Sequence, residues 1–137
     1  ATNTIENTKE LLLKSNGVIL CISSICGLEV IKGAPVTYSC AKAALNAYVK
    51  SIALPFAEKG VRINALALGN IMFDGSTWER KMKEDPLKVK SMLINEVPLN
   101  KFGTLKDVVN YVCFLISPLA SFATGSVYTL DGGQTKS

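Results

Sequence analysis

Short apolar segments that alternate with helix-forming segments constrain the fold of this chain more than any other feature. The segment "GVILCISS" (17–24) reads as a short, wholly apolar strand, and "VRINALALG" (61–69) reads as a second buried strand. Strands of a parallel sheet have this character when helices cover both sides. A third strand, "GSVYTLDGG" (125–133), lies near the end of the sequence. The alternation predicts right-handed crossovers and an α/β fold with a parallel sheet.

Helices are expected before, between and after the first two strands. We expect them in "TIENTKELLLKS" (4–15), in "TYSCAKAALNAYVKSIAL" (37–54), and in "LKDVVNYVCFLI" (105–116). Pro55 should bend the second helix near its end, whereas Thr104 and Asp107 resemble a capping box that opens the last. A charged stretch, roughly 74–101, should hold one or two short helices around Trp78 and Lys88. The 137 residues suffice for a single domain, 1–137, and not for two.

Composition excludes several classes of function. The sequence contains no histidine, which rules out Ser-His-Asp and Cys-His catalysis, and we expect no metal site. The net charge of +4 comes with no basic stripe interleaved with aromatics, so nucleic acid is not an expected partner. No apolar run approaches membrane-spanning length and no signal peptide is visible, so we expect no membrane association and a cytoplasmic location. The four cysteines should be buried, reduced thiols.

The helix at 37–54 carries a phenol and an ammonium among small apolar residues. Tyr38 and Lys42 are four residues apart, so they share one helix face. A phenol is a weak acid at neutral pH, but a close positive charge stabilises the phenolate and so makes the phenol a better proton donor. Ser24 ends the first strand and "LGNI" (68–71) ends the second, and ligands bind at the carboxyl ends of parallel strands. These groups can therefore converge, although a Tyr–Lys pair alone also arises often by chance.

Four ordered motifs resemble the C-terminal half of the short-chain dehydrogenase/reductase family. They are "ISSICG", "YSCAK", "VRINALALGNI" and "SPLASFATGSVYTLDGG". In the family the corresponding pattern is a serine, Tyr-x-x-x-Lys, an Asn-x-x-x-Pro-Gly strand end and a terminal Asp-Gly-Gly. The resemblance implies the C-terminal half of a doubly wound, Rossmann-like sheet, most similar to 3-oxoacyl-[acyl-carrier-protein] reductases.

The resemblance also implies roles for individual residues. Ser24 would orient the substrate oxygen, and Tyr38 would transfer the proton. Lys42 would strengthen the tyrosine as an acid and bind the nicotinamide ribose, while the backbone around Gly69 and Ile71 would border the nicotinamide. The implied activity is an NAD(P)-dependent oxidoreductase that interconverts a secondary alcohol and a ketone, with NAD or NADP as cofactor. The implied assembly is a homo-dimer or homo-tetramer.

Some features depart from the family pattern. The glycine-rich turn that binds the pyrophosphate belongs to an N-terminal dinucleotide-binding half that we expect to be absent here. Leu68 stands where the family usually has proline, which should loosen a rigid turn, and Phe73 stands about where a threonine often contacts the carboxamide. The alternative function is therefore a truncated or degenerate module without catalysis, serving folding, oligomerisation or scaffolding.

Two further segments allow more than one interpretation. The stretch around Trp78 matches the segment that covers the substrate in the family, and it is equally compatible with a solvated pair of helices that packs over this ring. The Asp131 to Gly133 segment should be a tight turn. Apolar positions such as Leu12, Leu45 and Tyr48 suit either the family's helix-to-helix dimer interface or contact with the chain's own sheet.

Overall fold

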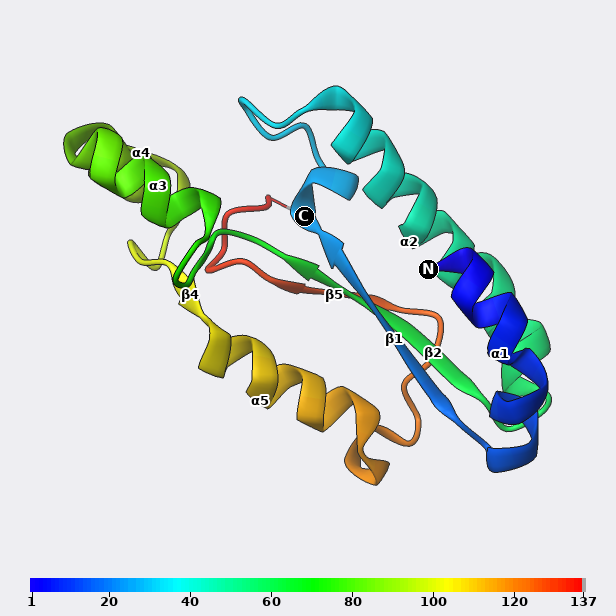
Figure 1. The fold of residues 1–137 in the computed structure, drawn as a ribbon. Coiled ribbons are helices and arrows are strands. Elements are labelled where there is room, and N and C mark those ends of the chain that lie inside the picture. The colour runs from blue at the N-terminus through cyan, green and yellow to red at the C-terminus, as the bar shows by residue number, and fades with distance from the viewer. Residues whose placement is uncertain (137) are drawn as a thin grey trace.

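A computed structural model describes residues 1–136 as a parallel sheet with helices on both faces (Figure 1). The sheet contains β1 (Val18–Ser24), β2 (Arg62–Leu68) and β5 (Val127–Leu130), all parallel, in the order β1-β2-β5. Val18 pairs with Arg62 at one end of β1, and Ser24 pairs with Leu68 at the other. The predicted α/β fold with a parallel sheet is confirmed.

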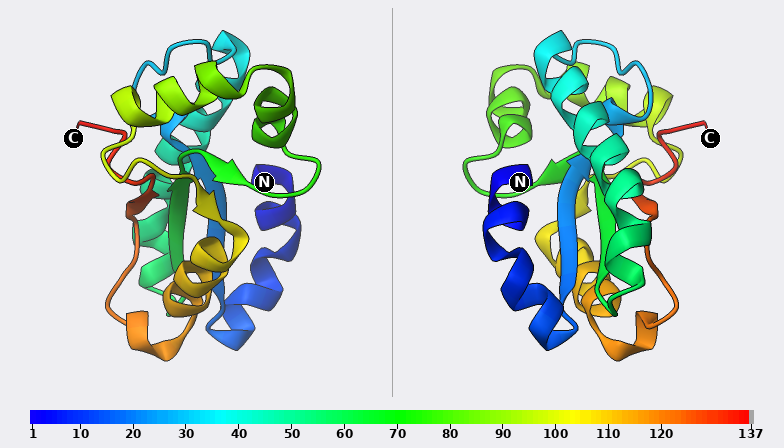
Figure 2. Two further views of the ribbon diagram at one scale, coloured as in Figure 1. Left: turned by 90° about the vertical axis from the view of Figure 1, so that its left-hand side faces the viewer. Right: turned by 90° about the vertical axis from the view of Figure 1, so that its right-hand side faces the viewer.

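The helices cover the two faces of this sheet unequally (Figure 2). The first two, α1 (Thr2–Ser15) and α2 (Val36–Ala57), lie on one face, and α5 (Leu105–Ile116) lies on the other. The buried core on the α1–α2 side contains Ile5, Cys21, Val49, Ala53, Phe56, Val61, Ile63 and Ala65. All three predicted helices are present, and α2 continues past Pro55 by two residues.

Three apolar positions, which suit either a dimer interface or the chain's own sheet, pack in part against this core. Leu12, Leu45 and Tyr48 are partly buried against it, and the Tyr48 hydroxyl donates a hydrogen bond to Glu6 Oε1 at 3.1 Å. Their contacts are therefore with the chain's own α1–α2 layer.

A second, very small sheet joins β3 (Ile71–Met72) to β4 (Gly103–Thr104) in parallel. Between them lie α3 (Thr77–Glu84) and α4 (Pro86–Glu96), which confirm the helices predicted in the charged stretch. Each has a side-chain cap: Ser76 Oγ accepts from the Glu79 N–H at 3.1 Å, and Asp85 Oδ1 accepts from the Lys88 N–H at 3.0 Å. Two 3-10 turns, η1 (Ile25–Gly27) and η2 (Pro118–Ala120), complete the fold.

The predicted capping box of α5 is present. Thr104 Oγ1 accepts a hydrogen bond from the Asp107 N–H at 3.2 Å, and Asp107 Oδ2 accepts one from the Thr104 N–H at 2.8 Å. Two backbone donors that the first turn of a helix leaves unpaired are thereby satisfied.

The expectation that all four cysteines are buried is wrong for two of them. Cys21 is buried and Cys26 is half-buried, but Cys40 and Cys113 are exposed, and all four are free thiols. Cys40 and Cys113 lie on the outward faces of α2 and α5, where apolar sequence does not guarantee burial because only one side of each helix meets the sheet. Separately, none of the helices within residues 1–136 has both the length and the apolar character needed to span a membrane.

Arg62 ties the end of α5 to the start of β2. Its Nη1 donates to the carbonyl oxygens of Leu115 and Ala123, both at 3.1 Å, and its Nη2 donates to that of Ser117, also at 3.1 Å. The carbonyls at a helix C-terminus have no partner within the helix, and a guanidinium carries both the donors and the charge that suit them. Arg62 therefore holds the C-terminal end of α5 against the start of β2.

We predict that Arg62→Met lowers the free energy of unfolding of the complete protein by about 2 kcal/mol, because three carbonyls lose a charged donor. The exposed Lys59→Met is the matched control and should change stability by less than about 0.5 kcal/mol. Chemical denaturation of both variants measures the difference, and equal midpoints would contradict the anchoring role.

The terminal Asp-Gly-Gly segment forms the predicted tight turn. Asp131 Oδ1 accepts from the Gly133 N–H at 2.9 Å, and Oδ2 accepts from the Thr135 N–H at 2.8 Å and from Thr135 Oγ1 at 2.7 Å. Partial burial by itself would raise the pKa of the Asp131 carboxyl, but the hydrogen bonds from Thr135 and Gly133 outweigh it and hold that pKa below its usual value.

Asp131→Asn should therefore destabilise the protein at neutral pH, by on the order of 1 kcal/mol after allowance for solvent screening. The carboxylate's contribution is complete above the ordinary aspartate pKa of about 3.9 and is lost as pH falls through the lowered value. The difference in unfolding free energy between parent and variant, measured by denaturant titration from pH 7 to pH 3, should shrink on acidification. A difference that stays constant over that range would exclude this linkage, and Asp74→Asn serves as the exposed control.

Candidate functional site

The Tyr38–Lys42 pair lies on one face of α2, as its spacing predicts. The helix begins at Val36 after Pro35, whose extended backbone (φ −62°, ψ 133°) directs the chain into the first turn. Tyr38 is therefore close to the helix N-terminus and is 43% exposed. The Lys42 Nζ atom lies 5.6 Å from the centre of the Tyr38 ring and donates a hydrogen bond to the Ile22 carbonyl of β1 at 2.9 Å.

Ser24 occupies the last position of β1 and caps the 3-10 turn that follows. Its backbone is extended (φ −148°, ψ 152°), and its Oγ accepts a hydrogen bond from the Cys26 N–H at 3.2 Å. The residue is only 6% exposed. The hydroxyl is thus held by the backbone of η1 and does not rotate freely at the surface.

Ser24 and Tyr38 line the same cavity, which has a volume of about 820 Å³. Gly69 and Asn70, just after β2, form part of its wall, so the carboxyl ends of two strands and the start of α2 meet there. The α3–α4 segment and the loop of residues 31–35 contribute the remaining sides, with Trp78 and Met92 among the apolar groups. Lys42 lies beside Tyr38 and contacts the strand.

Gly69 is required by a close approach of two strand ends. A Cβ atom at this position would lie 2.7 Å from both the Cα and the Cβ of Asp131. Leu68, which stands in place of the expected proline, pairs with Leu130 in β5, and the Gly69 N–H donates to the Leu130 carbonyl at 3.0 Å. The turn that the missing proline was expected to loosen is therefore held by strand pairing.

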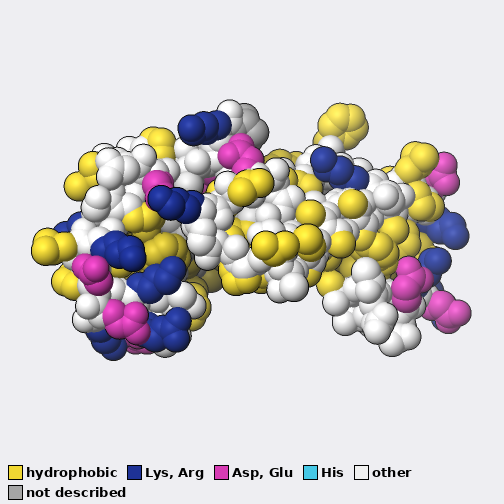
Figure 3. Space-filling model, turned by 90° about the horizontal axis from the view of Figure 1, so that it is seen from above, with side chains coloured by type: hydrophobic (Ala, Val, Ile, Leu, Met, Phe, Trp, Pro, Cys, Tyr) yellow, Lys and Arg dark blue, Asp and Glu magenta, His cyan; other side chains and the backbone are white. Residues whose placement is uncertain are grey.

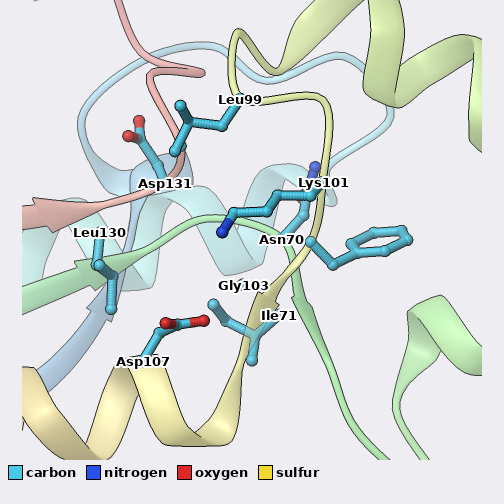
Figure 4. A pocket seen from close by; sticks show the side chains of 10 residues that line it. Asn70, Ile71, Leu99, Lys101, Gly103, Asp107, Leu130 and Asp131 are labelled. Carbon is cyan, nitrogen blue, oxygen red and sulfur yellow. The ribbon is translucent and has the colours of Figure 1, made fainter.

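Ile71 is not among the residues that line this large cavity. It is 9% exposed and lines a second cavity of about 130 Å³, where Figure 4 shows Lys101 extending between Asp107 and Asp131. Asn70 lines both cavities. Phe73, the other departure from the family pattern, is 45% exposed and lines neither of these two cavities.

The side chains over the large cavity carry both signs of charge. Lys81 and Lys88 line it together with Glu84 and Asp85. The view from above shows basic and acidic side chains intermixed over the end of the molecule formed by α3 and α4 (Figure 3). Trp78 of α3 packs against Phe102, which directly precedes β4, with ring centres 5.4 Å apart. The Lys81 Nζ atom lies 4.6 Å from the centre of the indole ring. The α3–α4 segment therefore presents no purely positive patch that would attract an anionic substrate.

Sequence reasoning missed residues around the site whose side chains are neither charged nor aromatic. Ser23 and Asn46 form a buried hydrogen bond directly behind Ser24, at 2.6 Å between Ser23 Oγ and Asn46 Oδ1. An asparagine one turn after Lys42 in an otherwise apolar helix was the available signal. Gln134 also lines the large cavity, because the C-terminal segment crosses to the loop after η1, where the Lys136 N–H donates to Glu29 Oε1 at 2.9 Å.

Comparisons with known proteins agree on one family. The family described as enoyl-(acyl carrier protein) reductase matches residues 1–135. The chain is 35% identical over 130 residues to the 3-oxoacyl-[acyl-carrier-protein] reductase FabG of Aquifex aeolicus, covering 94% of this chain and 50% of that protein. The chain spans about half the length of the curated relatives it matches.

Solved structures have the same fold over the same half. An oxidoreductase of the short-chain dehydrogenase/reductase family from Burkholderia thailandensis superposes with a TM-score of 0.84 at 31% identity, covering 96% of this chain and 50% of the other. The structure described as ElxO with NADP bound gives a TM-score of 0.82 at 32% identity, covering 95% and 51%. The chain belongs to the short-chain dehydrogenase/reductase family of oxidoreductases.

Proposed function

We propose that this chain is the catalytic C-terminal half of an NAD(P)-dependent oxidoreductase that interconverts a secondary alcohol and a ketone. The observation that supports the proposal most directly is the shared cavity: the hydroxyl-bearing residues Ser24 and Tyr38 both line it, and Lys42 lies beside the phenol. A cavity of about 820 Å³ is large enough for a small-molecule alcohol or ketone, and its lining mixes apolar groups such as Trp78 and Met92 with polar and charged ones.

Tyr38 is the proposed proton donor in reduction and the proton acceptor in oxidation. Its partial exposure leaves the phenol accessible to a substrate oxygen from the cavity side. Ser24 is suited to orient that oxygen: its Oγ already accepts from the Cys26 N–H, and its own O–H finds no acceptor within residues 1–136. That hydrogen is therefore available to a substrate carbonyl or hydroxyl, which would be held beside the phenol.

Lys42 is the proposed charged partner of Tyr38, and its Nζ atom lies 5.6 Å from the centre of the Tyr38 ring. The hydrogen bond from Nζ to the Ile22 carbonyl uses one of the three ammonium hydrogens. The other two remain for a ribose hydroxyl or a water molecule. Lysine thus contributes a fixed charge and spare donors at the same place.

The residues present fit the nicotinamide end of NAD or NADP. Tyr38, Gly69 and Asn70 wall the large cavity, and Lys42 brings donors of the kind a ribose hydroxyl needs. The bound cofactor would supply or accept the hydride. Residues 1–136 contain no glycine-rich turn from a strand into a helix, so the pyrophosphate would be held by the N-terminal half that belongs to this proposal.

The homo-dimer or homo-tetramer is also part of the proposal. Leu11 on α1 and Leu54 on α2 are apolar side chains that are 69% and 70% exposed. Exposed apolar groups of this size are a common component of subunit interfaces.

Tyr38→Phe in the complete protein should lower kcat by about 10²- to 10⁴-fold, because only the proton-transferring hydroxyl is lost. The melting temperature should stay near that of the parent. The measurement is the change in absorbance of NADH or NADPH with a panel of small ketones. Tyr48→Phe, which removes a hydroxyl from the same helix outside the cavity, is the control and should retain activity. Near-parental turnover by Tyr38→Phe would refute the assignment of the acid.

Lys42→Met keeps the length of the side chain and removes its charge. We predict that this variant loses alcohol oxidation, the direction in which Tyr38 accepts the proton, most severely at neutral pH and recovers it partly at alkaline pH. The pH dependence of kcat distinguishes this electrostatic role from simple damage to the fold. A profile parallel to that of the parent would contradict it.

A further inference from the structure

A buried polar cluster joins the end of β1, the 3-10 turn η1 and helix α2. Ser23 and Asn46 are 3% and 5% exposed. Ser23 Oγ and Asn46 Oδ1 are 2.6 Å apart, and Asn46 Nδ2 donates to the Gly27 carbonyl at 3.2 Å. We call Ser23, Asn46 and the Gly27 carbonyl the clamp.

The chemistry of the clamp fixes the direction of each hydrogen bond. A backbone carbonyl can only accept, so the asparagine NH₂ group must face Gly27 and its carbonyl oxygen must face Ser23. The Ser23 hydroxyl is then the donor. Well-packed apolar side chains at both positions would stabilise the fold about as well. Polar groups whose hydrogen bonds are all made also specify one position of η1 relative to α2. The clamp therefore selects a geometry as well as contributing to the core.

The clamp residues are neighbours of the residues that form the proposed site. Ser23 immediately precedes Ser24, and Asn46 lies one turn after Lys42 on the face that also carries Tyr38. Gly27 ends the turn that Ser24 caps, and its backbone touches the helix: a Cβ there would lie 2.6 Å from the Lys42 carbonyl carbon.

We propose that the clamp is a positioning device that sets the Ser24 hydroxyl against Tyr38 and Lys42. The inference rests on the proposed function and names residues that touch neither substrate nor cofactor. Ser23 and Asn46 act through Ser24 and through the seating of η1 on α2. Displacements of about 1 Å in a reacting group are enough to cost large factors in rate.

The test compares Ser23→Ala, Asn46→Leu and the double variant in the complete protein. Each single change leaves a buried polar partner unpaired, so both should lower the melting temperature and kcat. The double variant removes the serine–asparagine pair together, so its loss of stability should be smaller than the sum of the single losses. Its kcat should nevertheless remain at least about tenfold below the parent, with KM changed less than about threefold.

If the two residues had a purely structural role, kcat would recover together with the melting temperature in the double variant. A double variant with parental kcat would overturn the proposal, as would turnover that simply follows the melting temperature through the series. Ser51→Ala is the matched control, because its hydroxyl bonds only to its own helix, at the Ala47 carbonyl, and is exposed. It should leave both quantities unchanged.

A second readout separates the clamp from the proposed function. Amide hydrogen exchange at Cys26 reports the turn that Ser24 caps, and it should be faster in the double variant than in Ser51→Ala. If the parent shows no cofactor-dependent turnover, the proposed function fails while faster exchange still supports the clamp. Unchanged exchange at Cys26 would overturn the clamp whatever the activity.

Discussion

The contact between η1 and the backbone of α2 is the constraint on which the site depends. Gly27 has no side chain, and a Cβ atom there would lie 2.6 Å from the Lys42 carbonyl carbon and 2.7 Å from the Ala43 nitrogen. The backbone that follows β1 can therefore pack directly against the backbone of the first half of α2. Ser24 and the Tyr38–Lys42 face are brought together by this approach, and the Lys42 ammonium reaches back to the Ile22 carbonyl of the same strand. A larger residue in place of Gly27 would separate the two elements that carry the proposed proton transfer.

The parts of this arrangement that follow from local rules could be predicted from the sequence. Apolar runs of strand length between helices indicate a covered parallel sheet, and such sheets place their functional groups at the carboxyl ends of the strands. Spacing of four residues places Tyr38 and Lys42 on one face, and Ser24 falls at the end of its strand. The capping box of α5 follows from Thr104 and Asp107 alone. In each case the residues that decide the structure are neighbours in the sequence.

What could not be predicted depends on contacts between distant segments. β3 and β4 have two residues each, too few to show a periodicity, yet their pairing places Ile71 against Gly103. The Ser23–Asn46 hydrogen bond joins residues 23 positions apart, so an asparagine in an apolar helix could indicate a buried polar contact but not its partner. The exposure of Cys40 and Cys113 depends in the same way on which side of a helix meets the sheet.

The departures at Leu68 and Phe73 bear differently on the proposed chemistry. At Leu68 the rigidity that a proline would give is replaced by pairing with Leu130, and the glycine that follows still allows the close approach to Asp131. Leu68 is thus part of the paired end of β2. Phe73 replaces a polar group by an exposed ring, and its N–H is taken by the Ser76 hydroxyl at 3.3 Å. Ser24, Tyr38 and Lys42, the proposed proton-transfer residues, are all present in this chain, whereas polar contacts to the carboxamide and phosphates of a cofactor would have to come from other groups.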